Sequence, residues 1–158
     1  MENIQVKIES PVKYYDFVDQ HGDLMATFRF VPSDLDIFDR HKKVLHEFEQ
    51  MQSELNAALS KADQLTEDEE FAMKKEYSER MKKELDYLFN SDTSGFFQVA
   101  SPFTPLDNGE PWVLVIIQNV VKIVESVTGK NMAAMKNKAE KYTEKYKAAP
   151  GKYPFPTA

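Results

Sequence analysis

The stretch "EPWVLVIIQNVVKIVESV", from Glu110 to Val127, is the most hydrophobic part of this chain. Its unbroken apolar run, Trp112 to Ile117, is much shorter than the roughly 20 apolar residues that a membrane-spanning helix needs. The polar residues that follow do not alternate with apolar ones, which favours a helix over a strand. Pro111 is expected in the first turn of this helix, and Gly129 is expected to end it. Apolar side chains cover nearly every side, so the helix is predicted to be central in a core or shared with a partner, and the core is the simpler interpretation.

Length, charge and cysteine content restrict the functions that remain. The chain has 158 residues, enough for one domain with a substantial core. Asp and Glu total 26 against 20 for Lys and Arg, and the resulting net charge of -6 disfavours a nucleic-acid partner. The lack of cysteine excludes disulfides, thiolate catalysis and cysteine-ligated metals. The opening residues, "MENIQVKIES", show neither a basic leader nor an apolar segment, so we expect a protein of the cytoplasm that is neither exported nor bound to a membrane.

The amino-terminal third contains the signals of a small sheet. Apolar and polar residues alternate before Pro11, which predicts a strand with one buried face. The apolar residues of this strand are Ile4, Val6 and Ile8. Two aromatic-rich runs, from Lys13 to Val18 and from Leu24 to Val31, flank the segment "DQHGD", which predicts a β-hairpin whose turn uses Gly22. A sheet of this size needs helices to cover its apolar face.

Two long helices are expected to provide that cover. The first is predicted from about Asp34 to about Ser60, with Ser33 or Asp34 as its cap. Its apolar stripe consists of Leu35, Phe38, Leu45, Phe48, Leu55 and Leu59. Thr66 and Glu69 form a capping-box pattern that starts the second helix, which is expected to end near Asn90. The stripe of the second helix is Phe71, Met81, Leu85 and Leu88. The short connection predicts that the two helices form an antiparallel hairpin.

The rest of the chain completes the predicted fold. Prolines and glycines interrupt any long helix between Ser91 and Pro111, so this segment is predicted to be a loop anchored by apolar residues. A peripheral, lysine-rich helix is predicted in "KNMAAMKNKAEKYTEKYK". We therefore predict an α+β fold class, mostly α, with a small N-terminal antiparallel β-sheet packed on a bundle of about four helices. Residues 1–147 are predicted to form a single domain, and residues 148–158 an extended, proline-rich C-terminal arm.

No pattern of residues indicates catalysis or metal binding. His41 and His46 do not share one face of the first predicted helix, and neither they nor His21 lie in a HExxH frame. The segment "SDLDIFD" lacks the glycine and the distal glutamate of a calcium loop, and its carboxylates suit the start of a helix. The sequence contains no GxSxG, phosphate-loop or dinucleotide motif. We predict that the protein is not an enzyme and uses no cofactor or metal ion.

The order of the predicted elements resembles a known protein family. After the hairpin come "VPSDLDIFDRHKKVLHEFEQM", then "ELDYLFNSDTSGFFQVASPF", then the apolar helix "WVLVIIQNVVKIVESV". From Ile4 to Lys147 this pattern resembles the tail assembly chaperone group of siphophages and related prophages in Gram-positive hosts, and the "LFNSD…SPF" junction is its most specific part. The resemblance implies a helical adaptor in the host cytoplasm that binds the tape-measure protein and tail-tube subunits during tail assembly. The proline-rich arm after Lys147 is not part of the family pattern.

Part of the apolar surface is therefore predicted to contact a partner, either a helical segment of the tape-measure protein or a second copy of this chain. The candidate contact residues are Phe96, Phe97, Phe103, Trp112, Ile116, Ile123, Tyr153 and Phe155. Two alternative functions stay open. The protein could be a virion structural subunit, such as a connector or tail component, whose arms lock into neighbouring copies. It could also be a small regulatory phage protein that binds a host target.

Overall fold

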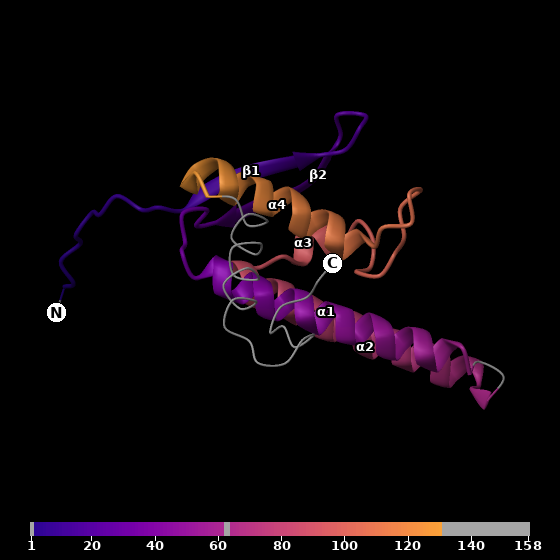
Figure 1. Ribbon diagram of the computed structural model, residues 1–158. Coiled ribbons are helices and arrows are strands. Elements are labelled where there is room, and N and C mark those ends of the chain that lie inside the picture. Colours follow the sequence, from indigo (N-terminus) through magenta and orange to yellow (C-terminus); the bar gives the residue numbers. More distant parts are fainter. Residues whose placement is uncertain (1, 62–63, 131–158) are drawn as a thin grey trace, which may run out of the picture.

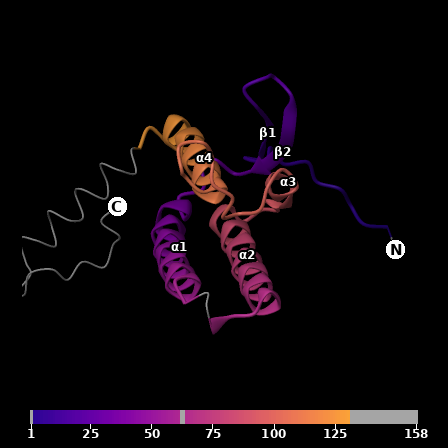
Figure 2. The ribbon, with the colours of Figure 1, turned by 90° about the vertical axis from the view of Figure 1, so that its right-hand side faces the viewer.

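The computed structural model describes residues 2–61 and 64–130. Along the chain, the elements are β1 (Lys13–Val18), β2 (Leu24–Phe30), α1 (Ile37–Leu59), α2 (Glu67–Phe89), α3 (Ser94–Phe97) and α4 (Trp112–Thr128). The two long helices run side by side, and α4 and the β-hairpin lie next to each other across one end of the pair (Figures 1 and 2). This architecture confirms the predicted fold class. The predicted lysine-rich helix and the arm at residues 148–158 lie outside the described residues.

The β-hairpin forms where the sequence predicts it. β1 and β2 are antiparallel, and their residues pair from Lys13 with Phe30 to Val18 with Leu24. Gly22 adopts a φ of +86° in the turn, a backbone conformation that glycine reaches without steric cost. The Asp19 carboxylate accepts hydrogen bonds from the backbone N–H groups of two other turn residues, at 2.8 and 3.0 Å. The turn is therefore stabilised by local chemistry that can be read from the sequence.

Predicted capping residues stop and start the long helices. The Thr66 hydroxyl accepts a hydrogen bond from the Glu69 backbone N–H at 3.1 Å, which confirms the predicted start of α2. Asn90 ends α2 in the left-handed conformation, with φ at 48°, and Gly129 ends α4 in the same way. Pro111 directly precedes α4 rather than lying inside its first turn.

The core lies between the hairpin, α4, residues 37–51 of α1 and residues 81–89 of α2. Phe28 of β2 is at its centre, with ring centroids 5.0 to 6.4 Å from four other phenylalanines. One side of α4 enters this core, where Val113, Val120 and Val124 are fully buried. The apolar helix of the opening stretch is therefore mainly a core element, as the simpler interpretation predicted.

Three predictions about local structure are wrong. The alternating segment before Pro11 forms no strand, because no other described strand pairs with it, and Ile4 is 92% exposed. α1 begins at Ile37 rather than near Asp34, whose carboxylate instead accepts the Asp36 backbone N–H at 2.9 Å. Leu35 and Phe71, assigned to buried stripes, are 62% and 69% exposed. Leu35 precedes α1, and Phe71 lies near the start of α2, where the helical hairpin extends past the core (Figure 1).

Candidate partner-binding groove

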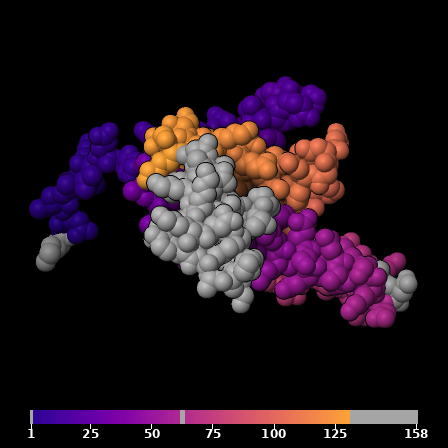
Figure 3. Space-filling view, in the orientation of Figure 1, coloured from indigo at the N-terminus to yellow at the C-terminus, as the bar shows by residue number. Residues whose placement is uncertain are grey.

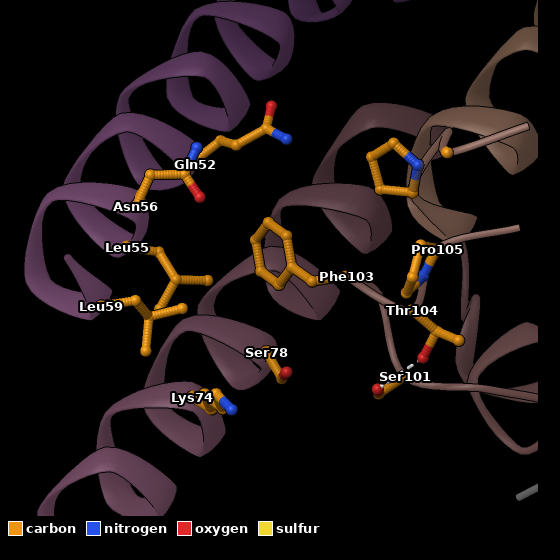
Figure 4. A pocket seen from close by; sticks show the side chains of 12 residues that line it. Gln52, Leu55, Asn56, Leu59, Lys74, Ser78, Ser101, Phe103, Thr104 and Pro105 are labelled. Atoms are coloured by element: carbon orange, nitrogen blue, oxygen red, sulfur yellow. Dashed lines mark hydrogen bonds between the residues drawn. The ribbon is translucent and has the colours of Figure 1, made fainter. Parts of the chain in front are cut away.

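A groove lies between the helical hairpin and the loop that precedes α4. Its volume is about 390 Å³. The residues that line it come from α1, α2 and residues 101–111: Gln52, Leu55, Asn56, Leu59, Lys74, Ser78, Ser101, Phe103, Thr104, Pro105, Gly109 and Pro111. Figure 4 shows the Phe103 ring between the side chains of α1 and those of the loop. The groove therefore joins parts of the chain that are distant in sequence.

Backbone hydrogen bonds hold the loop wall of the groove against the start of α4. The Trp112 backbone N–H donates to the Thr104 carbonyl at 2.8 Å, and the next N–H of α4 donates to the Pro102 carbonyl at 2.9 Å. Pro105 and Pro111 form an isolated antiparallel bridge. The first two contacts use N–H groups at the helix start, which have no partner within the helix itself. The loop wall is therefore tied to the helix that anchors the core.

The floor of the groove is apolar. Phe103 stacks on Phe48 of α1, with ring centroids 6.1 Å apart and planes 13° apart. Leu55 is 8% exposed but lies outside the main cluster of core residues, and Leu59 is only half-buried. Amides, hydroxyl groups and Lys74 form the rim, where the lysine ammonium pairs with Glu70 at 3.0 Å. An apolar floor with a polar rim suits the apolar side chains of a partner segment.

A polar cluster joins the two helices beside the groove. The Tyr77 hydroxyl donates to the Glu54 carboxylate at 2.8 Å, and the Arg80 guanidinium lies 5.1 Å from the centre of the Tyr77 ring. The hydrogen bond to Glu54 raises the pKa of Tyr77 above its usual value, and desolvation acts in the same direction. The Tyr77 hydroxyl therefore links α2 to α1, the two helices that form one side of the groove.

The structure separates the predicted contact residues into three groups. Phe96 and Ile116 are 2% and 3% exposed, so in this conformation they contact the domain's own core rather than offering surface to a partner. Phe97, Phe103, Trp112 and Ile123 are partly buried against that core, and of these only Phe103 lines the groove. Tyr153 and Phe155 lie outside the described residues.

Trp112 has a structural role that the sequence did not indicate. Its indole Nε1–H donates to the Phe96 carbonyl at 2.8 Å, which ties α3 to the start of α4. Replacing Trp112 by Ala would break this link, so a loss of binding in that variant would not identify a contact. Better probes of the groove are residues of the loop, such as Pro105, and residues at the end of α1, such as Leu59.

Sequence reasoning missed the groove but contained one sign of it. The apolar stripe of α1 continues to Leu55 and Leu59, past the part of the helix that the core covers. Where the apolar face of an amphipathic helix continues beyond the core, its side chains remain available to contact another chain.

The described residues contain no cluster of side chains suited to binding a metal ion. Within 2–61 and 64–130, no group of three or more His, Asp or Glu side chains could hold a metal ion. No helix in the same ranges has the length and apolar character needed to cross a membrane.

No known protein family, curated protein or solved structure matches this chain.

Proposed function

We propose that this protein is a non-catalytic tail assembly chaperone or adaptor that binds the tape-measure protein and tail-tube subunits in the host cytoplasm. The observation that best supports this proposal is the groove with an apolar floor between the helical hairpin and the 101–111 loop. A tape-measure protein is a long helical chain whose apolar face would aggregate before the tube encloses it. An escort for such a chain needs an apolar groove for a helical segment and a charged exterior that keeps the complex soluble.

The charge distribution supports the same function. The net charge is -6, and α2 has four acidic residues in its first turn, at the distal end of the helical hairpin. Surface charge of one predominant sign opposes self-aggregation of a complex that carries bound apolar sequence.

Co-expression with the tape-measure protein, followed by size exclusion chromatography in high salt, tests the proposal. We expect co-elution to persist in high salt, because ions screen charge pairs but not apolar contacts. Leu59→Asp, which places a charge in the groove, should abolish co-elution while the circular dichroism spectrum stays that of a folded protein. Leu24→Asp is the matched control, since Leu24 is 63% exposed on the β-hairpin. Separate elution of the unmodified proteins, or equal losses in both variants, would contradict the proposal.

A second candidate function is a virion structural subunit, and the extended segment before β1 supports it. Ile8 in this segment is 83% exposed, and arms of this kind can join neighbouring subunits. Mass spectrometry of purified particles distinguishes the two functions. A chaperone should be missing from the particles, whereas a structural subunit should be present in a fixed ratio to the other tail proteins.

A further inference from the structure

The segment Glu2–Ser10, called the arm below, extends away from the domain (Figure 3). All of its residues are exposed, and its three apolar side chains are 92%, 77% and 83% exposed. These side chains belong to Ile4, Val6 and Ile8. In the part of the chain that the structure describes, no backbone hydrogen bond joins the arm to the domain. Three large aliphatic side chains on alternate residues, all in water, would form one face of a strand, and no described residue pairs with this segment.

The sheet has one edge that suits such a strand. Its other edge, along β2, is occupied, because the Ser91 hydroxyl donates to the Arg29 carbonyl and α3 packs beside Ala26. β1 forms the outer edge, and no described residue other than those of β2 forms a backbone hydrogen bond with Lys13–Val18. The pairing of the two strands is irregular at one point, where β2 has an extra residue, Met25. The side chains of β1 therefore alternate between the two faces of the sheet without interruption. An edge strand with unpaired backbone groups is a template for another strand.

The side chains of the arm and of β1 are complementary. Tyr15 and Phe17 point toward the core but are only partly buried, so their rings are incompletely covered. In an antiparallel pairing that sets Val6 opposite Phe17, Ile8 lies opposite Tyr15 and completes that cover. The same register places Lys7 opposite Asp16 on the outer face, where their opposite charges attract. A shift by one residue would instead turn the aliphatic face of the arm toward solvent.

The arm is poorly suited to reach β1 of its own chain. A two-residue hairpin loop needs residues with positive φ, usually Gly, Asn or Asp, and the connection "ESPVK" contains none of these. Pro11 fixes its own φ near −65°, and the backbone N–H of Val12 is bound to the Ser10 hydroxyl at 3.1 Å. The connection therefore directs the arm away from its own sheet, as Figures 1 and 2 show.

We propose that the arm of one copy adds as a third strand to the outer edge of β1 in a second copy of this chain. If two copies exchange arms, both arms and both β1 edges become paired, so a closed dimer is the expected product. The geometry of the arm and of the sheet supports this pairing independently of the proposed function.

The mass in solution of the full-length protein tests the proposal. Light scattering after size exclusion, over a range of concentrations, should show a species larger than the 18.2 kDa single chain. Val6→Asp should shift the protein to the single-chain mass, because the new carboxylate would be buried against Phe17 of the second copy. Gln5→Asp adds the same charge to the solvent-facing side of the arm and should leave the larger species intact. A single-chain mass for the unmodified protein at every concentration, or equal effects of the two variants, would overturn the proposal.

Cross-linking tests the register and separates two copies from one. The natural chain has no cysteine, so Lys7→Cys and Asp16→Cys each introduce a unique thiol. A short bis-maleimide should join the two variants, when they are mixed, into a product of twice the single-chain mass. Adding Val6→Asp to the Lys7→Cys variant should suppress that product. A doubly substituted chain that cross-links only within itself would show that the arm pairs with its own β1, which overturns the proposal.

Discussion

Replacing Ile116 by Ala tests whether the most apolar helix belongs to the core or to an interface. Ile116 is 3% exposed, and it lies on the side of α4 that faces the hairpin and the long helices. The substitution removes most of a buried side chain from the second turn of α4 without introducing a charge. Alanine is also the best helix former, so any loss of stability arises from packing rather than from helix propensity.

The expected cost follows from burial. Truncating a fully buried isoleucine to alanine costs about 2–5 kcal/mol, and the near-complete burial of Ile116 points to the upper half of that range. A domain typically unfolds with a free energy of about 5–15 kcal/mol, so the variant should lose a large fraction of its stability. At about 2–4 °C per kcal/mol for a chain of this size, Tm should fall by about 7–20 °C.

Urea denaturation and differential scanning calorimetry measure the effect, and Ile123→Ala is the matched control. Ile123 lies on the same helix but is only partly buried, so its truncation should cost less, about 1 kcal/mol. The slope of unfolding free energy against urea should stay the same in both variants. If Ile116→Ala were no more destabilising than Ile123→Ala, the assignment of Ile116 to the core would be refuted.

Substitutions at three further residues test individual interactions. Burial, followed by the charge of Glu47, raises the pKa of Glu84, so the folded state binds this proton more tightly than the unfolded chain does. This stabilisation is present at pH values below the unfolded pKa, about 4.3, and is lost as the pH rises through the folded pKa. The Tm of Glu84→Gln, relative to that of the natural protein, should therefore increase as the pH rises from about 4 to 7. Asp86→Ala should cost about 1–3 kcal/mol in chemical denaturation, because the buried Thr93 hydroxyl and N–H both donate to that carboxylate, at 2.6 and 2.8 Å. Arg40→Ala should cost about 1.5–3 kcal/mol in the same assay, because the guanidinium donates to a backbone carbonyl at the end of α2 at 2.9 Å, and Arg40→Lys should restore only part of the loss.

Features set by neighbouring residues could be predicted from the sequence. The turn at Gly22, the start of α2 at Thr66, and the ends of α2 and α4 at Asn90 and Gly129 all lie where the sequence places them. Each depends on a backbone conformation or a cap whose chemistry involves only a few adjacent residues. Local signals of this kind fix where elements begin and end, but not which surfaces meet.

The candidate groove could not be predicted because it depends on contacts between distant residues. Phe103 becomes part of the floor by stacking on Phe48, and neither residue carries a local sign of the other. α3 was also missed, since a helix of this length depends on the Asp86 carboxylate, which accepts from Thr93 just before it. Alternation of apolar and polar residues likewise identifies the two faces of a strand but not its partner strand. The segment before Pro11 alternates in this way, so the sequence wrongly predicts that it belongs to the sheet.

The apolar surfaces that remain accessible in the folded domain are the candidate sites for partner binding. The buried side of α4, including Ile116, is filled by the hairpin and by the long helices, so it cannot supply affinity without unfolding the domain. Among the described residues, the apolar surface that stays accessible includes two separate places, the arm around Val6 and the groove around Leu59. Because they are distinct, self-association and partner binding should respond to different substitutions, and effects at sites without shared contacts should add. A Val6→Asp chain that stays single but still binds the tape-measure protein would show that the groove works without the arm.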